Sequence, residues 1–237
     1  IRLQYALFLT RRENSDLDEA EAVLARAIEL LPSNPIAMHV AAEVELEKGR
    51  RASASIVASS HFARARRMAS ELAGSPRASM HPYHTLFKIA INELRRSVAE
   101  GGLEDPLVPE RMGQVEHVLS RAMDRFPDEA IFLAAEAEYA EFLGKNHAAR
   151  EALRRAVDSD PANVVAVLRF VRILETDGDV DKCESLLERL AEAHPLDSRV
   201  HAALGSFLVR YGRKPDNAEH HLQQAIVTGR RVPRIQF

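Results

Sequence analysis

The residues that could bind a metal or support catalysis are ten histidines and a single cysteine. His81 and His84 are three residues apart, and His220 and His221 are adjacent. A zinc site needs three or four histidine, cysteine or carboxylate ligands at regular spacing. Neither pair has such partners nearby, and Pro82 falls inside the first. We therefore predict no metal site and interpret the His-Pro-Tyr-His segment as a helix start, where proline is favoured.

Nucleophilic and phosphate-binding motifs are absent from the sequence. It contains neither a glycine-rich phosphate loop nor a serine in a Gly-x-Ser-x-Gly turn. Cys183 lies among helically spaced apolar residues, where burial usually makes a thiol unreactive. A single cysteine also rules out an internal disulfide and fits a reducing compartment. We predict a protein without enzymatic activity or a bound cofactor.

The composition favours helices. With 237 residues and 46% hydrophobic content the chain can bury a sizeable core, while aromatic residues make up only 5% and tryptophan is absent. A net charge of −3 gives no general attraction to nucleic acid or acidic membranes. No apolar run reaches the roughly 18 residues of a membrane span, and no signal peptide is evident. We expect a cytoplasmic protein, and the start at Ile1 suggests a piece of a longer polypeptide.

Residues 164–197 show most clearly how the chain is organised. They contain two helical patterns, separated by a turn at Asp177 and Gly178 and followed by Pro195, which cannot continue a helix. Each pattern can bury only one face, so the two helices must pack against each other and against neighbours. Similar units recur at intervals of about 34 residues.

The second helix of these units carries a spacing signature. A small residue is followed by a large one four positions on, a small one three further, and a proline five beyond, with variation between units. The signature occurs as Ala20, Leu24, Ala27 and Pro32; Val115, Leu119, Ala122 and Pro127; Ala149, Leu153, Ala156 and Pro161; and Cys183, Leu187, Leu190 and Pro195. Small residues allow two helices to approach closely, and large ones fill the groove beside them.

This signature resembles that of the tetratricopeptide repeat family. The resemblance implies an all-α fold, a right-handed superhelical array of antiparallel helix pairs. It predicts a single array with units at about 1–34, 35–76, 81–129, 130–163, 164–197 and 198–237. Two units are irregular: about ten residues are inserted near 50–60, as an extended helix or a mobile loop, and unit 81–129 has a long first helix and a long turn over 101–109.

Tetratricopeptide-like arrays hold peptides or helices in a groove lined by their first helices. Transferring the family's groove positions implies a binding surface that is acidic at its front and middle and basic at its C-terminal end, where arginines could receive an acidic protein segment. One subfamily grips a terminal carboxylate with lysine and asparagine, which this chain lacks at the matching positions. The implied partner-binding residues are Tyr5, His39, Glu43, Glu138, Arg169, Arg172, Arg199 and Arg210.

Alternatives to a peptide-binding scaffold remain open. The array could be a ligand-sensing or oligomerisation segment of a larger NTPase or effector protein, and the apolar ends of an array can pair copies into a homo-oligomer. A nucleic-acid-binding array is a further alternative, because residues 50–67 contain five arginines and no acid. That alternative is less favoured, since only Phe62 could stack on a base there.

Overall fold

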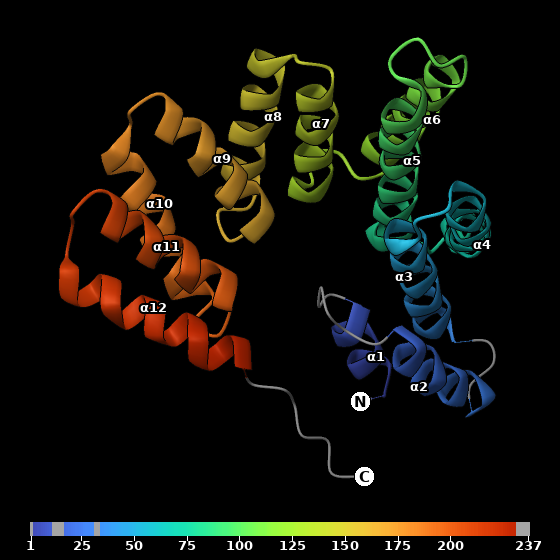
Figure 1. Cartoon of the computed structure of the whole chain (residues 1–237), viewed down its shortest axis with the longest axis horizontal. Helices are drawn as coiled ribbons and strands as arrows, with labels where there is room; N and C mark the ends of the chain where they lie inside the picture. The colour runs from blue at the N-terminus through green and yellow to red at the C-terminus, as the bar shows by residue number, and fades with distance from the viewer. Residues whose placement is uncertain (1, 11–16, 31–33, 231–237) are drawn as a thin grey trace. The chain divides into compact units, whose positions relative to one another are not determined.

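A computed structural model describes residues 2–10, 17–30 and 34–230. Within these ranges the chain forms twelve α-helices and no strands (Figure 1), so the predicted all-α fold is confirmed. The chain divides into two compact units, residues 1–127 and 128–237, each built from consecutive helix pairs. No helix in the described ranges is both long and apolar enough to cross a membrane.

The first unit contains three helix pairs. They are α1 (Arg2–Thr10) with α2 (Leu17–Leu30), α3 (Pro35–Arg51) with α4 (Ser55–Ala73), and α5 (Met80–Gly101) with α6 (Val108–Arg125). The two members of each pair pack together, and α3 also contacts α1 and α5. The first helices of successive pairs are therefore neighbours.

The second unit repeats this arrangement. Its pairs are α7 (Ala130–Phe142) with α8 (Asn146–Ser159), α9 (Val164–Thr176) with α10 (Val180–Ala193), and α11 (Ser198–Arg210) with α12 (Pro215–Arg230). Helix α9 contacts both α7 and α11, so the first helices again lie side by side. Glycines with positive φ lie in the three turns within the pairs, at 144, 178 and 212, which is one every 34 residues. Glycine suits these positions because it has no Cβ to clash there.

The spacing signature forms the core. In α8 and α10 its residues are at most 1% exposed, and Ala20, Leu24 and Ala27 of α2 are also buried; Pro32 lies outside the described residues. Close packing of α11 on α12 depends on Gly205, since a Cβ there would lie 2.8 Å from Cγ of Leu222. Small residues thus set the distance between paired helices.

The irregular region is helical. Helix α4 begins at Ser55, so the extra residues near 50–60 lengthen this helix, and only residues 52–54 connect it to α3. Helix α5 has 22 residues. The turn that follows is shorter than expected, because α6 begins at Val108 and Pro109 lies in its first turn. Proline is compatible with that position because its missing N–H has no partner to lose.

Candidate functional site

Helices α3 and α5 share a partly buried charged pair. The Glu43 carboxylate of α3 accepts hydrogen bonds from Thr85 Oγ1 at 2.6 Å and Lys88 Nζ at 2.5 Å, both on α5. Its side chain is only 15% exposed. Thr85 and Lys88 are three positions apart, so they project from the same side of α5. The carboxylate of Glu43, a predicted binding residue, is therefore already bonded to side chains of the neighbouring first helix α5.

The electrostatics of this pair fix its charge state. Burial alone would raise the pKa of Glu43, but the charge of Lys88 and the hydrogen bonds from Lys88 and Thr85 outweigh it and lower that pKa to about 2. Burial and the Lys88 charge lower the pKa of the adjacent His84 to about 3. At neutral pH the cluster thus holds an ionised Glu43 beside a neutral His84.

The predicted residues His39 and Tyr5 also contact neighbouring helices. The His39 ring of α3 stacks on that of His81 of α5, with centroids 5.6 Å apart. Tyr5 of α1 donates a hydrogen bond to Glu19 of α2 at 2.9 Å. The α5 residues of this cluster were not predicted, because no groove position was transferred to α5. Polar side chains spaced three to four residues apart along this helix were the available signal.

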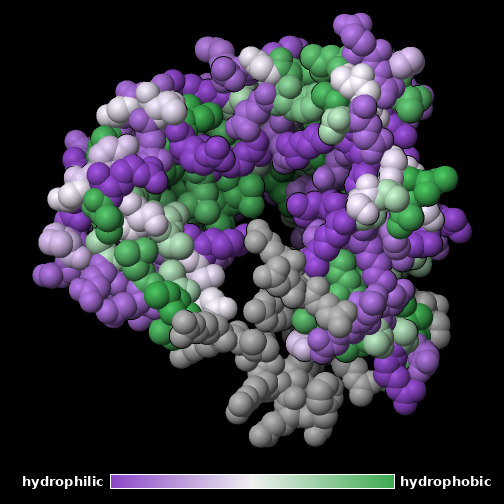
Figure 2. Space-filling view, viewed as in Figure 1, coloured by the Kyte–Doolittle hydropathy of each residue, from purple (hydrophilic) through white to green (hydrophobic). Residues whose placement is uncertain are grey.

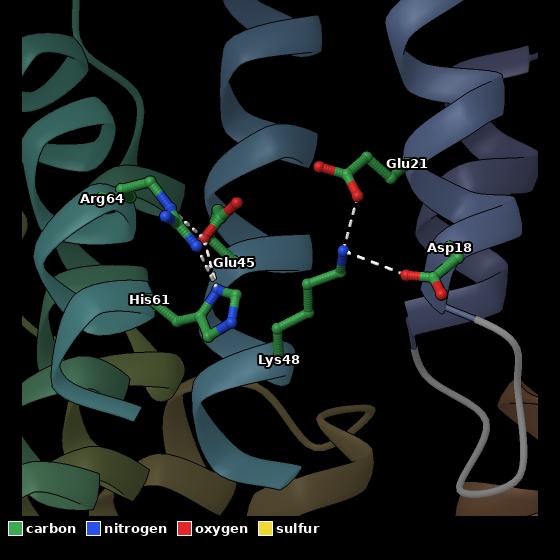
Figure 3. Close-up of polar contacts among 6 residues, drawn as sticks. All are labelled: Asp18, Glu21, Glu45, Lys48, His61 and Arg64. Atoms are coloured by element: carbon green, nitrogen blue, oxygen red, sulfur yellow. Dashed lines mark hydrogen bonds and ion pairs between the residues drawn. The ribbon is translucent and has the colours of Figure 1, made fainter. Parts of the chain in front are cut away.

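Other polar side chains of α3 hold it to the second helices on either side (Figure 3). Lys48 Nζ bonds Glu21 at 2.5 Å and Asp18 at 3.3 Å, both on α2. On α4, His61 and Arg64 both contact the Glu45 carboxylate at 2.8 Å. These contacts join consecutive pairs and leave no open site at these groups.

The basic segment 50–67 is mostly neutralised. Four of its five arginines form ion pairs with glutamates of the same unit, and for Arg67 no ion pair is found among the described residues. The pairs are Arg50 and Arg51 with Glu47, Arg64 with Glu45, and Arg66 with Glu93. A phosphate backbone would have to displace these carboxylates, which weakens the case for nucleic-acid binding.

In the second unit, Arg169 joins α9 to α7. Its guanidinium donates to the Ala134 carbonyl at 3.1 Å and bonds Glu141 at 2.7 Å, with Glu138 3.5 Å away. The side chain is only 18% exposed. The structure thus brings together two predicted residues, Arg169 and Glu138, as partners of each other.

The two C-terminal arginines of the predicted set are also paired. Arg210 of α11 bonds Glu175 of α9 at 2.6 Å. Arg199 bonds Asp197, the N-cap of its own helix, at 2.6 Å. The expected basic end of the groove therefore consists largely of arginines that face acids.

Arg172 differs from the other predicted arginines. It is exposed on α9, and its guanidinium makes no ion pair or hydrogen bond with any described residue. It borders a cavity of about 570 Å³ between the end of α9 and the start of α8. On the same rim, Arg150 of α8 bonds Asp177 at 2.6 Å. Arg172 is thus available to a ligand without breaking an internal contact.

The buried His201 and Cys183 serve the packing. His221 of α12 stacks on the buried His201 of α11 with centroids 5.2 Å apart, and their Nδ1 atoms are 2.9 Å apart. Cys183 is fully buried, and this burial raises the pKa of its thiol to about 11. In the described part of the chain no group of three or more histidine, cysteine or acidic side chains could hold a metal ion.

Comparisons with known proteins agree with this architecture. Two family models, each described as tetratricopeptide repeat, match residues 5–58 and 143–206. TTC0263, a thermophilic TPR protein of Thermus thermophilus, is 18% identical with a TM-score of 0.58, over 81% of this chain and 91% of that one. No curated protein gives a significant sequence match.

Two further structures align over 96% of this chain but correspond to only about half of their own lengths. Yeast Tom70 is 13% identical, with a TM-score of 0.42 and 50% of its chain covered. A chain of the APC/C hetero-tetramer Cut9-Hcn1 is 12% identical, with a TM-score of 0.41 and 52% covered.

Proposed function

Because the chain belongs to the tetratricopeptide-repeat-like family, we propose that it is a non-catalytic scaffold that holds a segment of a partner protein along the exposed face of its first helices. Proteins of this family are typically interaction scaffolds. Stacked helix pairs leave one side of the first helices open, and an extended peptide or a helix can lie there.

The observation that carries this proposal is the exposed, unpaired Arg172 on α9. Most charged residues of the first helices are satisfied by neighbouring helices, as Arg169 and Arg210 are. These pairs stabilise the stack and keep its face polar. Arg172 retains its full capacity for forked hydrogen bonds to a carboxylate, so the partner segment is expected to be acidic where it passes α9.

A role in self-association has one observation in its favour. Val157 in α8 and Ala191 in α10 occupy equivalent positions in successive repeats. Each is 7% exposed, because the first helix of the following pair covers it. In α12 the equivalent residue, Ile226, is 54% exposed, and apolar side chains interrupt the hydrophilic surface along this helix (Figure 2). Sedimentation equilibrium of wild type and Ile226→Glu tests it: a mass that rises with concentration only in the wild type favours this role.

The main proposal is tested by affinity capture from a lysate. The immobilised chain is compared with Arg172→Glu and with Arg189→Glu, a matched reversal of an exposed arginine on α10. We expect proteins that are retained by the wild type and by the control to be lost from Arg172→Glu, with equal helicity in all three. Identical capture by all three proteins would overturn the assignment of the binding face.

A further inference from the structure

The cavity beside Arg172 has the make-up of a receptor for one side chain. It lies in the second unit where the last turns of α9 meet the first turn of α8, and the end of α7 closes one side. It is partly open to solvent and has a volume of about 570 Å³, which is enough space for a single side chain. Residues from a second helix line it, so it extends beyond the first-helix face.

The cavity wall contains more basic than acidic residues. Three arginines, Arg150, Arg169 and Arg172, face two acids, Glu141 and Asp177. Both acids are already engaged, Glu141 by Arg169 at 2.7 Å and Asp177 by Arg150 at 2.6 Å. Arg169 also lies 3.5 Å from Glu138, which is not part of the wall. Arg172 is therefore the arginine of the wall that has no acidic partner among the described residues, and an incoming carboxylate would not have to displace an internal acid.

The rest of the wall suits a side chain with a short apolar stem. Ala149 and Ile173 contribute apolar surface, and His147 on the α8 rim adds a ring that can donate a hydrogen bond. A glutamate could lay its methylene groups on this surface and place its carboxylate at Arg172. An aspartate has one methylene fewer to bury, and a lysine would be repelled by the unpaired charge of Arg172.

The next repeat shows that these features are particular to this place. Thirty-four residues on, Arg172 is replaced by Ser206 and Ile173 by Phe207, a buried aromatic that is 2% exposed. His147 and Arg150 are replaced by the acids Asp181 and Glu184. One repeat later, Arg213 and Lys214 form ion pairs with these acids. That place therefore has no equivalent of the unpaired Arg172, and the larger Phe207 stands where Ile173 lines the cavity.

We propose that this cavity between α8 and α9 binds a glutamate side chain of the partner's acidic segment, with Arg172 as its charge partner and Ile173 as its floor. The inference rests on the proposed function and adds the chemistry of one anchor residue. Arg172 approaches the carboxylate with paired N–H donors, a geometry that also discriminates against an amide.

The test uses a displayed library of random 12-residue peptides, selected against the whole wild-type chain, followed by binding measurements on the synthetic peptides. We expect selected peptides to share a glutamate whose replacement by glutamine weakens binding about tenfold. Arg172→Ser and Ile173→Phe, which introduce the residues of the next repeat, should each weaken binding by a similar factor. Arg189→Ser should leave it unchanged, and helicity confirms that each variant folds.

Other outcomes contradict the inference in distinguishable ways. Peptides that bind without an acidic residue, or that bind the Ile173→Phe variant as well as the wild type, would overturn the cavity while leaving the scaffold proposal intact. Enrichment of aspartate instead of glutamate would overturn the chosen anchor residue. A selection that enriches no peptide would also overturn the inference, and the lysate capture with Arg172→Glu then decides the scaffold proposal separately.

Discussion

Replacing Glu43 by glutamine is expected to destabilise the first unit by an amount that depends on pH. The carboxylate lies between α3 and α5, 15% exposed, with Lys88 and Thr85 bonded to it. Glutamine keeps the size of the side chain and can still accept a hydrogen bond from Thr85. It removes the charge, so Lys88 loses its ionic partner in a site that is largely screened from water.

The magnitude follows from the pKa of Glu43. Lowering it from the ordinary value of 4.5 to about 2 corresponds to about 3 kcal/mol of stability for the ionised form, at 1.36 kcal/mol for each tenfold change. Because the folded-state pKa is depressed, this contribution is fully present above pH 4.5 and is lost as the pH falls toward 2. At pH 3 about 1.5 kcal/mol of it should remain.

Hydrogen exchange of the α3 and α5 amides measures this effect, since it reports on the first unit apart from the second. Wild type and Glu43→Gln should differ by about 2 to 3 kcal/mol at pH 7 and by roughly half as much at pH 3. Glu104→Gln, the same change at an exposed carboxyl of the same unit, serves as the control and should have little effect at either pH. A difference between wild type and Glu43→Gln that stays constant over this pH range would refute the assigned charge state.

Two further outcomes follow from the packing. Gly49→Ala would place a Cβ 2.6 Å from the ring of the buried Phe62, so α3 and α4 must move apart. Urea unfolding should show that the free energy of unfolding falls by about 1 to 3 kcal/mol. A urea midpoint equal to that of the wild type would contradict the close approach of the two helices. Cys183, whose burial raises the thiol pKa to about 11, should react with iodoacetamide at pH 8 only after denaturant is added. Rapid alkylation of the native chain would show that α9 and α10 open readily.

The helix pairs were predictable from the sequence because the same residues are needed in each repeat. Ala149, Leu153 and Ala156 recur at fixed spacing, and a close helix crossing tolerates few alternatives there. The course of residues 50–60 was left open between a helix and a loop. Alanine and serine permit both, and contact with α5, including the bond from Ser55 Oγ to Glu100, helps hold the helix in place.

The candidate site was only partly predictable. Repeat positions identified Arg169 and Glu138 individually. Their ion pair joins two residues that are 31 positions apart and lie on different helices, and spacing within one helix does not reveal it. For the same reason, the prediction that the groove changes from acidic to basic toward its C-terminal end did not include the ion pair between Arg210 and Glu175. The cavity was not predictable, because its wall is formed by residues of three different helices, α7, α8 and α9, with Ile173 among them.

Site-specific photo-crosslinking tests the central claim, that the first helices form the partner-binding face, most directly. Two exposed serines of the second unit offer a matched pair: Ser206 on the first helix α11, one repeat after Arg172, and Ser185 on the second helix α10. A photoreactive amino acid at position 206 should crosslink to partner proteins in a lysate, while the same group at 185 should not. Crosslinks from 185 and none from 206 would contradict the assignment of the face.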